Sequence, residues 1–320
     1  MPDSSANREP IEVRRICLIL FPLFGLLAQQ SPLQSTADTD VKITVDSTLV
    51  EIPVTVTDPM NRFVLGLDKK DFSLVEDGEN QTVVHFSGDE APLSVGLLID
   101  TSGSMIANMG IARGAVNEFL KTMNSGDEAF LIEFSDSAKV TQEFTGRPSD
   151  IRDRMTSMQS GGLTALLDAV GLGVKEMKKA KNTRKALIVI SDGGDNHSRY
   201  TAAELKDIVK EADTQVYAMG VFEAVILPGL SNDLVSGPRL LGQIADQTGG
   251  RAYGASTLSQ LPSIAEKIAI ELHNQYVLGY YPVNKDKDGK YRGVEVRVKA
   301  PDAMPTLKAR WRTGYYAPSQ

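Results

Sequence analysis

The chain has 320 residues, 42% hydrophobic and 23% charged, a balance typical of folded globular domains. Its length is enough for about two domains. Its formal net charge of −7, with no basic patch that interleaves aromatic residues, argues against nucleic acid or another polyanion as the partner. The only cysteine is Cys17, which excludes an intramolecular disulfide framework.

Residues 1–28 have the pattern of a secretory signal peptide. Arg14 and Arg15 precede a short apolar run that ends at Ala28, a small residue followed by a polar segment. Because the run is too short for a comfortable membrane span, we expect export, cleavage near Ala28 and no stable span afterwards. The alternatives are an uncleaved anchor or a buried helix. An exported chain whose mature part lacks cysteine fits a periplasmic, cell-surface or secreted protein.

Residues 29–40 are polar and without periodicity, which predicts a linker. Residues 41–88 then alternate apolar and polar side chains and are rich in β-branched residues, as strands are. Within them, residues 71–87 predict two strands around the turn Glu76–Asn80. We therefore expect the first part of a small β domain at 41–88.

The pattern changes between residues 91 and 274. Continuous apolar runs at 93–99 and 186–190 predict strands that are buried on both faces, and helical patterns follow each of them. Further strands are predicted at 128–134, 139–144, 214–222 and 251–256. This alternation predicts an α/β fold with a doubly wound, mostly parallel sheet flanked by helices (Rossmann-like), whose ligands bind beyond the carboxyl ends of the strands.

Five polar residues follow these strands or begin a helix at that edge. Asp100, Ser102 and Ser104 come after the first apolar strand, Thr164 stands at a Gly-rich helix entry, and Asp192 comes after the later strand. Two carboxylates and three hydroxyls are hard oxygen donors, suited to Mg²⁺ or Mn²⁺, with Ca²⁺ as another option, and poorly suited to zinc or copper. The sequence therefore predicts one metal site.

The ordered pattern D-x-S-x-S, then T, then S-D-G resembles the metal-ion-dependent adhesion site of von Willebrand factor A-type (VWFA) domains, over about residues 93–273. The resemblance extends to bacterial exported VWFA-related proteins. It implies that Ser102, Ser104 and Thr164 are hydroxyl ligands, and that the two aspartates act directly or through water. An acidic residue of a protein partner would fill the remaining position. The implied function is an exported metal-dependent adhesion module, not an enzyme. Ordinary polar turns are the plainer interpretation of the same residues.

The last segment, residues 275–317, is again β-rich. Residues 275–283 and 291–300 predict a hairpin, and 307–318 a third strand. About fifty residues bury too little surface to fold alone, so we expect these strands to complete the β domain of residues 41–88 as a small β-sandwich-like unit. The VWFA-type domain, 91–274, would be inserted between its halves. VWFA-related sequences end with a similar Y-x-L-G-Y-Y-P pattern, and an immunoglobulin-like β module often precedes their A-type domain.

A second metal pattern lies in the predicted hairpin turn. Asn284, Asp286, Asp288, Gly289 and Glu295 occupy positions 1, 3, 5, 6 and 12 of an EF-hand calcium loop. An EF-hand needs helices on both sides, whereas both flanks here predict strands. A simple turn is therefore favoured over a calcium site.

Three features near the predicted metal edge have two interpretations each. Residues 223–238 form either a loop that contacts the partner or a passive connector. Asp195 and His197 either tune the site or are solvated loop residues, and we favour the latter. The final helix, about 258–274, changes the affinity of the site in family members by shifting, but the sequence does not show whether it does so here.

Two other functions remain as alternatives to adhesion. One is a structural scaffold or assembly factor of the cell envelope, whose metal site is non-functional or purely structural. The other is a metal-dependent hydrolase with an aspartyl nucleophile, which usually requires a second acid where Ser102 stands. The sequence contains no G-x-S-x-G elbow and no nucleotide-binding glycine loop. The partner and the oligomeric state stay open.

Overall fold

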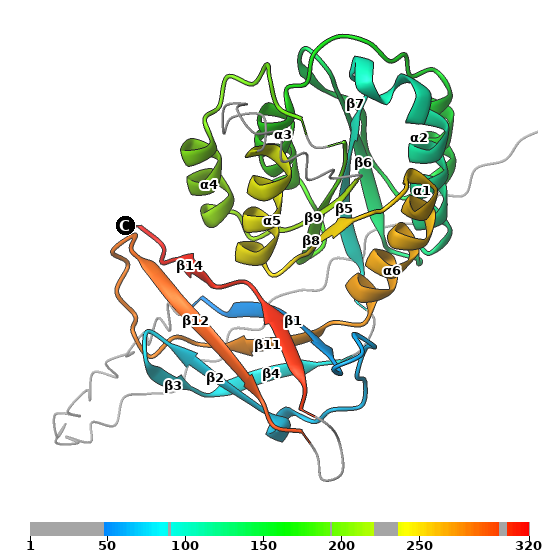
Figure 1. Ribbon diagram of the computed structural model, residues 1–320. Helices are drawn as coiled ribbons and strands as arrows, with labels where there is room; N and C mark the ends of the chain where they lie inside the picture. Colours follow the sequence, from blue (N-terminus) through cyan, green and yellow to red (C-terminus); the bar gives the residue numbers. More distant parts are fainter. Residues whose placement is uncertain (1–47, 89–90, 193, 221–235, 301–305, 320) are drawn as a thin grey trace, which may run out of the picture. The chain divides into compact units, whose positions relative to one another are not determined.

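The structure is a computed structural model that describes residues 48–88, 91–192, 194–220, 236–300 and 306–319 (Figure 1). Contacts divide the chain into residues 1–45 and 46–320, and every described residue belongs to the second unit. The predicted signal peptide and linker, the start of the first predicted strand and most of the predicted loop 223–238 lie outside the described residues. None of the described helices is long and apolar enough to span a membrane.

A six-stranded sheet forms the centre of the α/β part, in the order β10-β9-β8-β5-β6-β7. Only β7, at one edge, runs antiparallel to its neighbour. The prediction of a mostly parallel sheet is therefore confirmed. The strands are β5 (Leu93–Asp100), β6 (Glu128–Phe134), β7 (Ala138–Thr145), β8 (Arg184–Ile190), β9 (Gln215–Gly220) and β10 (Ala252–Gly254).

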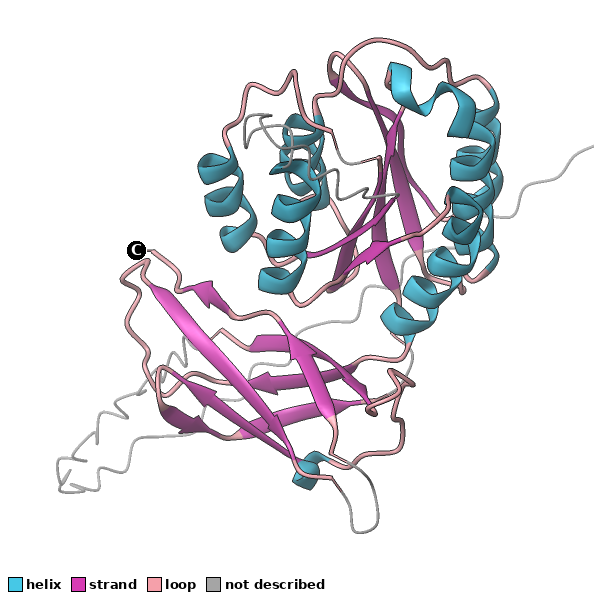
Figure 2. Ribbon diagram, in the orientation of Figure 1, coloured by secondary structure: helices cyan, strands magenta, loops and turns pink. Residues whose placement is uncertain are grey.

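Helices cover both faces of this sheet (Figures 1 and 2). Leu97 and Ile99 of β5 pack with α1, α2 and α6 on one face, and Leu98 packs with α3, α4 and α5 on the other. All eight residues of β5 are buried, because side chains of both faces meet a helix layer. The helices are α1 (Met109–Lys121), α2 (Pro148–Thr156), α3 (Leu166–Met177), α4 (Ala202–Glu211), α5 (Ser236–Thr248) and α6 (Leu261–His273). Short 3₁₀ helices are η1 (Lys69–Asp71), η2 (Gly103–Asn108) and η3 (Leu258–Gln260).

Two four-stranded antiparallel sheets form the β part, in the orders β13-β1-β11-β4 and β14-β12-β2-β3. Each sheet combines strands that precede the α/β part with strands that follow it. This confirms the expectation that N- and C-terminal segments build one β unit. The strands are β1 (Val50–Thr57), β2 (Phe72–Glu76), β3 (Glu79–Gln81), β4 (Val83–Ser87), β11 (Tyr276–Tyr280), β12 (Tyr291–Val298), β13 (Lys308–Trp311) and β14 (Gly314–Tyr316).

The two β sheets share one apolar core, as a sandwich requires. Ile52 of β1 and Leu74 of β2 belong to the same buried cluster. The buried carboxylate of Glu76 crosses between the sheets, accepting hydrogen bonds from the hydroxyl of Tyr280 at 2.6 Å and that of Tyr315 at 2.9 Å. Burial, followed by the hydrogen bond to Glu76, raises the pKa of both tyrosines, so both stay neutral donors.

The predicted hairpin of residues 275–283 with 291–300 is wrong. β11 pairs with β1 and β4, whereas β12 pairs with β2 and β14 in the opposite sheet. The predicted pair within 71–87 is right only in part. β2 and β3 pair around Asp77 and Gly78, which both have positive φ, as tight hairpin turns require, but the chain then crosses to the other sheet as β4.

Candidate metal centre

The five predicted ligands lie at the edge of the parallel sheet where the strands end. β5 ends at Asp100, and β8 lies beside it with Ile99 opposite Ile190. Asp192 therefore follows the end of the strand adjacent to the one that carries Asp100. Thr164 lies two residues before the first residue of α3. Ligands of α/β sheets bind at such an edge, because the loops between strands and helices meet there.

Backbone hydrogen bonds join the loop after β5 to the segment that carries Thr164. The N–H of Gly103 donates to the carbonyl of Gly162 at 3.0 Å. In the other direction, the N–H of Gly161 donates to the carbonyl of Thr101 at 2.7 Å. These paired bonds hold the serine-bearing loop against the entry to α3.

The loop after β8 is joined to the same segment through Thr164 itself. The Thr164 carbonyl accepts hydrogen bonds from the N–H groups of Asn196 at 3.0 Å and His197 at 3.1 Å. The Thr164 N–H donates to the side-chain oxygen of Asn196 at 2.9 Å. The segment from Gly161 to Thr164 therefore contacts both of the other loops. The sequence did not identify Asn196, although asparagine beside Asp and Gly commonly bonds to nearby backbone.

Asp100 is fully buried and both of its carboxylate oxygens accept hydrogen bonds. Oδ1 accepts the N–H of Ser102 at 2.8 Å, and Oδ2 accepts the hydroxyl of Ser191 at 2.6 Å. Burial, with a smaller contribution from the negative charge of Asp192, raises the pKa of Asp100 against the opposing hydrogen bonds. A divalent cation beside the carboxylate would favour its ionised form. Sequence analysis included Ser191 in the S-D-G pattern but assigned it no role, because its contact with Asp100 is recognisable only once β5 and β8 are known to be neighbours.

Ser102 and Ser104 present their hydroxyls together. Their Oγ atoms are 3.0 Å apart, so one hydroxyl donates to the other. The backbone of Ser102 is extended, and η2 begins immediately after it, which brings Ser104 back toward Ser102. Ser102 and Thr164 are buried, whereas Ser104 is exposed. The three hydroxyl groups of the predicted site therefore include two buried ones and one at the surface.

The residues fit a hard divalent cation by the chemistry of their donor atoms. The described part of the chain contains no group of three or more His, Cys, Asp and Glu side chains placed to hold a metal. The five predicted residues include only two carboxylates, so binding would depend on the hydroxyls as well. Oxygen donors of this kind suit Mg²⁺, which keeps water in its remaining positions.

The loop after β6 supports the segment before Thr164. The N–H of Leu163 donates to Asp136 Oδ1 at 2.7 Å, and the N–H of Ala165 donates to the carbonyl of Ser135 at 2.8 Å. Gly162 has φ +87, and a Cβ there would lie 2.7 Å from Asp136 Oδ2. Only glycine fits this turn without displacing the carboxylate.

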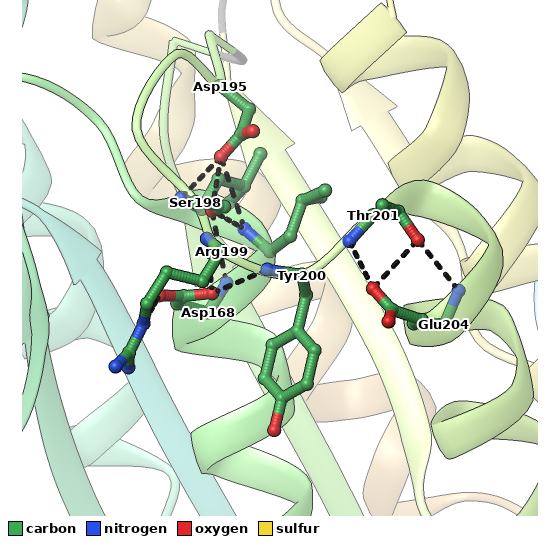
Figure 3. Close-up of polar contacts among 9 residues, drawn as sticks. Asp168, Asp195, Ser198, Arg199, Tyr200, Thr201 and Glu204 are labelled. Carbon is green, nitrogen blue, oxygen red and sulfur yellow. Dashed lines mark hydrogen bonds and ion pairs between the residues drawn. The ribbon is translucent and has the colours of Figure 1, made fainter.

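Asp195 has a structural role that sequence analysis did not expect (Figure 3). Its Oδ1 accepts the N–H groups of Leu166 at 2.9 Å and Leu167 at 3.3 Å, and the hydroxyl of Ser198 at 2.6 Å. Asp195 thus caps the start of α3, where a negative charge is also favoured by the helix dipole. The interpretation as a solvated loop residue is wrong for Asp195. His197 is exposed and contacts Thr164 through its backbone.

Asp168, in the first turn of α3, holds the next part of the same loop (Figure 3). Its carboxylate accepts the N–H groups of Arg199 at 3.0 Å and Tyr200 at 3.1 Å, and the Arg199 guanidinium at 3.1 Å. Thr201 and Glu204 then form a capping box that begins α4. The part of the connection between Asp195 and Tyr200 is consequently held to the start of α3.

Acidic residues of the EF-hand pattern form ion pairs with basic side chains of the same chain. Asp288 contacts Arg292 at 2.9 Å and Lys290 at 3.1 Å, and Glu295 contacts Arg297 at 2.7 Å. Residue Glu295 lies in strand β12 instead of a helix. These contacts favour a turn held by ion pairs over a calcium site.

Residues 95–194 match the family model of the von Willebrand factor type A domain. The match runs from β5 to the loop after β8 and includes all five predicted ligands. It supports the VWFA resemblance of the α/β part. No curated protein gives a match.

Three solved structures show a low similarity to this chain. The PilB minor pilin from Streptococcus sanguinis is 16% identical with a TM-score of 0.46, over 58% of this chain and 62% of the pilin, less than two thirds of its length. An aerotolerance-related membrane protein from Bacteroides fragilis, with multiple mutations to serines, is 20% identical with a TM-score of 0.45, over 56% of this chain and 98% of that one. A von Willebrand factor type A protein from Catenulispora acidiphila is 13% identical with a TM-score of 0.49, over 77% and 72%. At these scores the likenesses add nothing to the family match.

Proposed function

We propose that the VWFA-type domain of this protein captures an acidic residue of a protein partner through a divalent cation. The ligands would be Asp100, Ser102, Ser104, Thr164 and Asp192. The observation that carries the proposal is the hydrogen bonding that joins the three segments on which these hard oxygen donors lie. The family match supports it, since domains of this type often mediate protein–protein interactions.

The capture would be electrostatic. A cation held mainly by neutral hydroxyls and few carboxylates keeps a strong attraction for a further carboxylate. The chain's own residues orient this arrangement: Ser191 and the N–H of Ser102 hold the Asp100 carboxylate, and Asn196 holds the backbone of Thr164. Such outer hydrogen bonds commonly matter for metal affinity nearly as much as the ligands do.

The signal-peptide pattern of residues 1–28 supports a location outside the cytoplasm. A partner would then be met in the periplasm, at the cell surface or in the medium. The competing proposal is a scaffold or envelope assembly factor with a purely structural site. It is favoured by the direct hydrogen bonds that join the loops to one another.

Calorimetric titration of the purified protein with Mg²⁺ and Mn²⁺ tests the site. We expect binding by the parent and its loss in Asp100→Asn and Thr164→Ala, with circular dichroism unchanged. Asp207→Asn, on the exposed face of α4, is a matched control that should bind like the parent. Equal binding by the parent and both site variants would contradict the proposed ligands.

The scaffold proposal makes a different prediction. If the site is only structural, the protein should bind the cation but show no metal-dependent affinity for a carboxylate-bearing peptide. Binding of such a peptide that disappears with a chelator would favour capture.

A further inference from the structure

We infer that the partner residue beside the captured carboxylate is aliphatic or aromatic, and that Ile106 and Leu163 receive it. This inference rests on the proposed function. Ile106 is 62% exposed and Leu163 is 45% exposed. Each lies next to a proposed ligand in the sequence, Ile106 two residues after Ser104 and Leu163 directly before Thr164.

A backbone hydrogen bond joins the loops that carry these two positions. Residues three apart eclipse each other in a 3₁₀ helix, so Ile106 of η2 lies over Gly103. The N–H of Gly103 contacts the carbonyl of Gly162, the residue before Leu163. The two aliphatic side chains therefore belong to loops that touch each other beside the hydroxyl ligands.

Both side chains are displayed by a fixed backbone. Met105 is fully buried in the core and anchors η2 next to Ile106. The N–H of Leu163 is held by Asp136, and Gly162 before it adopts a turn that only glycine fits. A rigid apolar surface loses little freedom when a partner covers it, which favours binding.

The charge around Leu163 restricts the chemistry of the partner further. The carboxylate of Asp136 lies beside Leu163 and is exposed. A second acidic residue of the partner at this position would meet a like charge, whereas an apolar residue would cover Leu163. The surface thus fits a segment in which a single Asp or Glu is flanked by apolar residues.

End-capped peptides test this preference in saturating Mg²⁺. The probes are Gly-Leu-Asp-Leu-Gly, Gly-Gly-Asp-Gly-Gly and Gly-Asp-Asp-Asp-Gly, with binding followed by nuclear magnetic resonance titration. We expect the leucine peptide to bind the parent about tenfold more tightly than the glycine peptide, a difference of about 1.4 kcal/mol. The triple-aspartate peptide should gain nothing over the glycine peptide.

The double variant Ile106→Ser with Leu163→Ser should bind Mg²⁺ and the glycine peptide like the parent but lose the tenfold preference. Met60→Ser is the matched control, because Met60 is an exposed apolar side chain of the β unit, 72% exposed. A leucine preference that persists in the double variant, or no preference in the parent, would overturn the inference and leave metal-dependent capture intact. Failure of all three peptides to bind in Mg²⁺ would instead overturn the proposed function, and the inference with it.

Discussion

Gly162 shows how one residue without a side chain shapes the candidate site. Its φ of +87 is strained for any other residue, and an added Cβ would lie 2.7 Å from Asp136 Oδ2. The carboxylate that would be displaced holds the N–H of Leu163, the residue before Thr164. A side chain at position 162 should therefore displace the Asp136 carboxylate, and the loss of its hydrogen bond should shift Leu163 and the adjacent Thr164.

We predict that Gly162→Ala lowers the free energy of unfolding by about 1–3 kcal/mol because of this backbone strain. It should also weaken Mg²⁺ binding. Gly110→Ala is the control, since Gly110 lies in α1 with no heavy atom within 4 Å of an added Cβ, and it should be neutral or stabilising. Chemical denaturation and calorimetry measure the two effects. Unchanged metal affinity in a destabilised Gly162→Ala would show that the turn does not position Thr164.

The five candidate ligands could be proposed from the sequence alone, but the contacts that support them could not. The sequence patterns D-x-S-x-S and S-D-G can be recognised directly, because the oxygen donor atoms belong to the residues that define the patterns. Ser191 and Asn196 act through neighbours that only the folded sheet provides, at 2.6 Å from Asp100 and 2.9 Å from Thr164. Sequence spacing does not reveal which loops of a parallel sheet will touch.

Helix α3 depends on Asp195 for its start, because that carboxylate accepts two of the first backbone N–H groups of the helix. We predict that Asp195→Ala destabilises the protein by about 0.5–2 kcal/mol, the usual cost of losing an N-cap. Asp195→Asn keeps a side-chain oxygen and should cost less. Thermal unfolding of the parent and of both variants measures the two losses of stability. Equal loss in both variants would show that the charge, not the hydrogen bond, is what matters.

The end of α6 is held by a buried pair of side chains. Asp127 Oδ2 is 3.0 Å from His273 Nε2, while His273 Nδ1 is 2.8 Å from the carbonyl of Ala269. Both ring nitrogens therefore lie within hydrogen-bond distance of an oxygen atom. Burial acts to raise the pKa of Asp127, but hydrogen bonds from His273 and from backbone N–H groups outweigh it and hold the pKa below 3.8.

This lowered pKa gives a stability that depends on pH. Because Asp127 is more acidic folded than unfolded, its contribution is present above about pH 3.8 and is lost as the pH falls through the lower folded pKa. We predict that Asp127→Asn is less stable than the parent at pH 7 and that the difference shrinks below pH 3.8. Denaturation curves at several pH values measure it. A difference that is constant from pH 7 to pH 3 would contradict this account.

Sequence periodicity predicted the helices and strands of the α/β part more accurately than the strand pairing of the β part. The strand predicted at 128–134 coincides with β6, and the strand predicted at 186–190 lies within β8. A continuous apolar run or a 3.6-residue period identifies such elements locally. In the sandwich, alternation shows which face of a strand is buried but not which strand lies beside it. The hairpin predicted for residues 275–283 and 291–300 was wrong because β11 pairs instead with β1, where Tyr280 lies opposite Val50, more than two hundred residues away in the sequence.

The connectivity of the chain makes the β unit depend on both of its ends. β1 lies between β11 and β13, and β2 lies between β12 and β3. Truncation after Asn274 would remove β11 and β13 from one sheet and β12 and β14 from the other. We predict that residues 48–88 can then form neither sheet, because β1, β2 and β4 lose the strands that pair with them. Limited proteolysis should then cleave within 48–88 in the truncated protein and not in the full chain. Equal protection in both would contradict the sandwich topology.

The central claim is that the five oxygen ligands hold a cation that stays open to a partner's carboxylate. Water proton relaxation with Mn²⁺ in place of Mg²⁺ tests this most directly, because bound Mn²⁺ reports on the water it retains. We predict enhanced relaxation on adding the protein, reduced by the peptide Gly-Leu-Asp-Leu-Gly but not by its asparagine counterpart. Enhancement that neither peptide changes, or that Thr164→Ala leaves intact, would contradict the account.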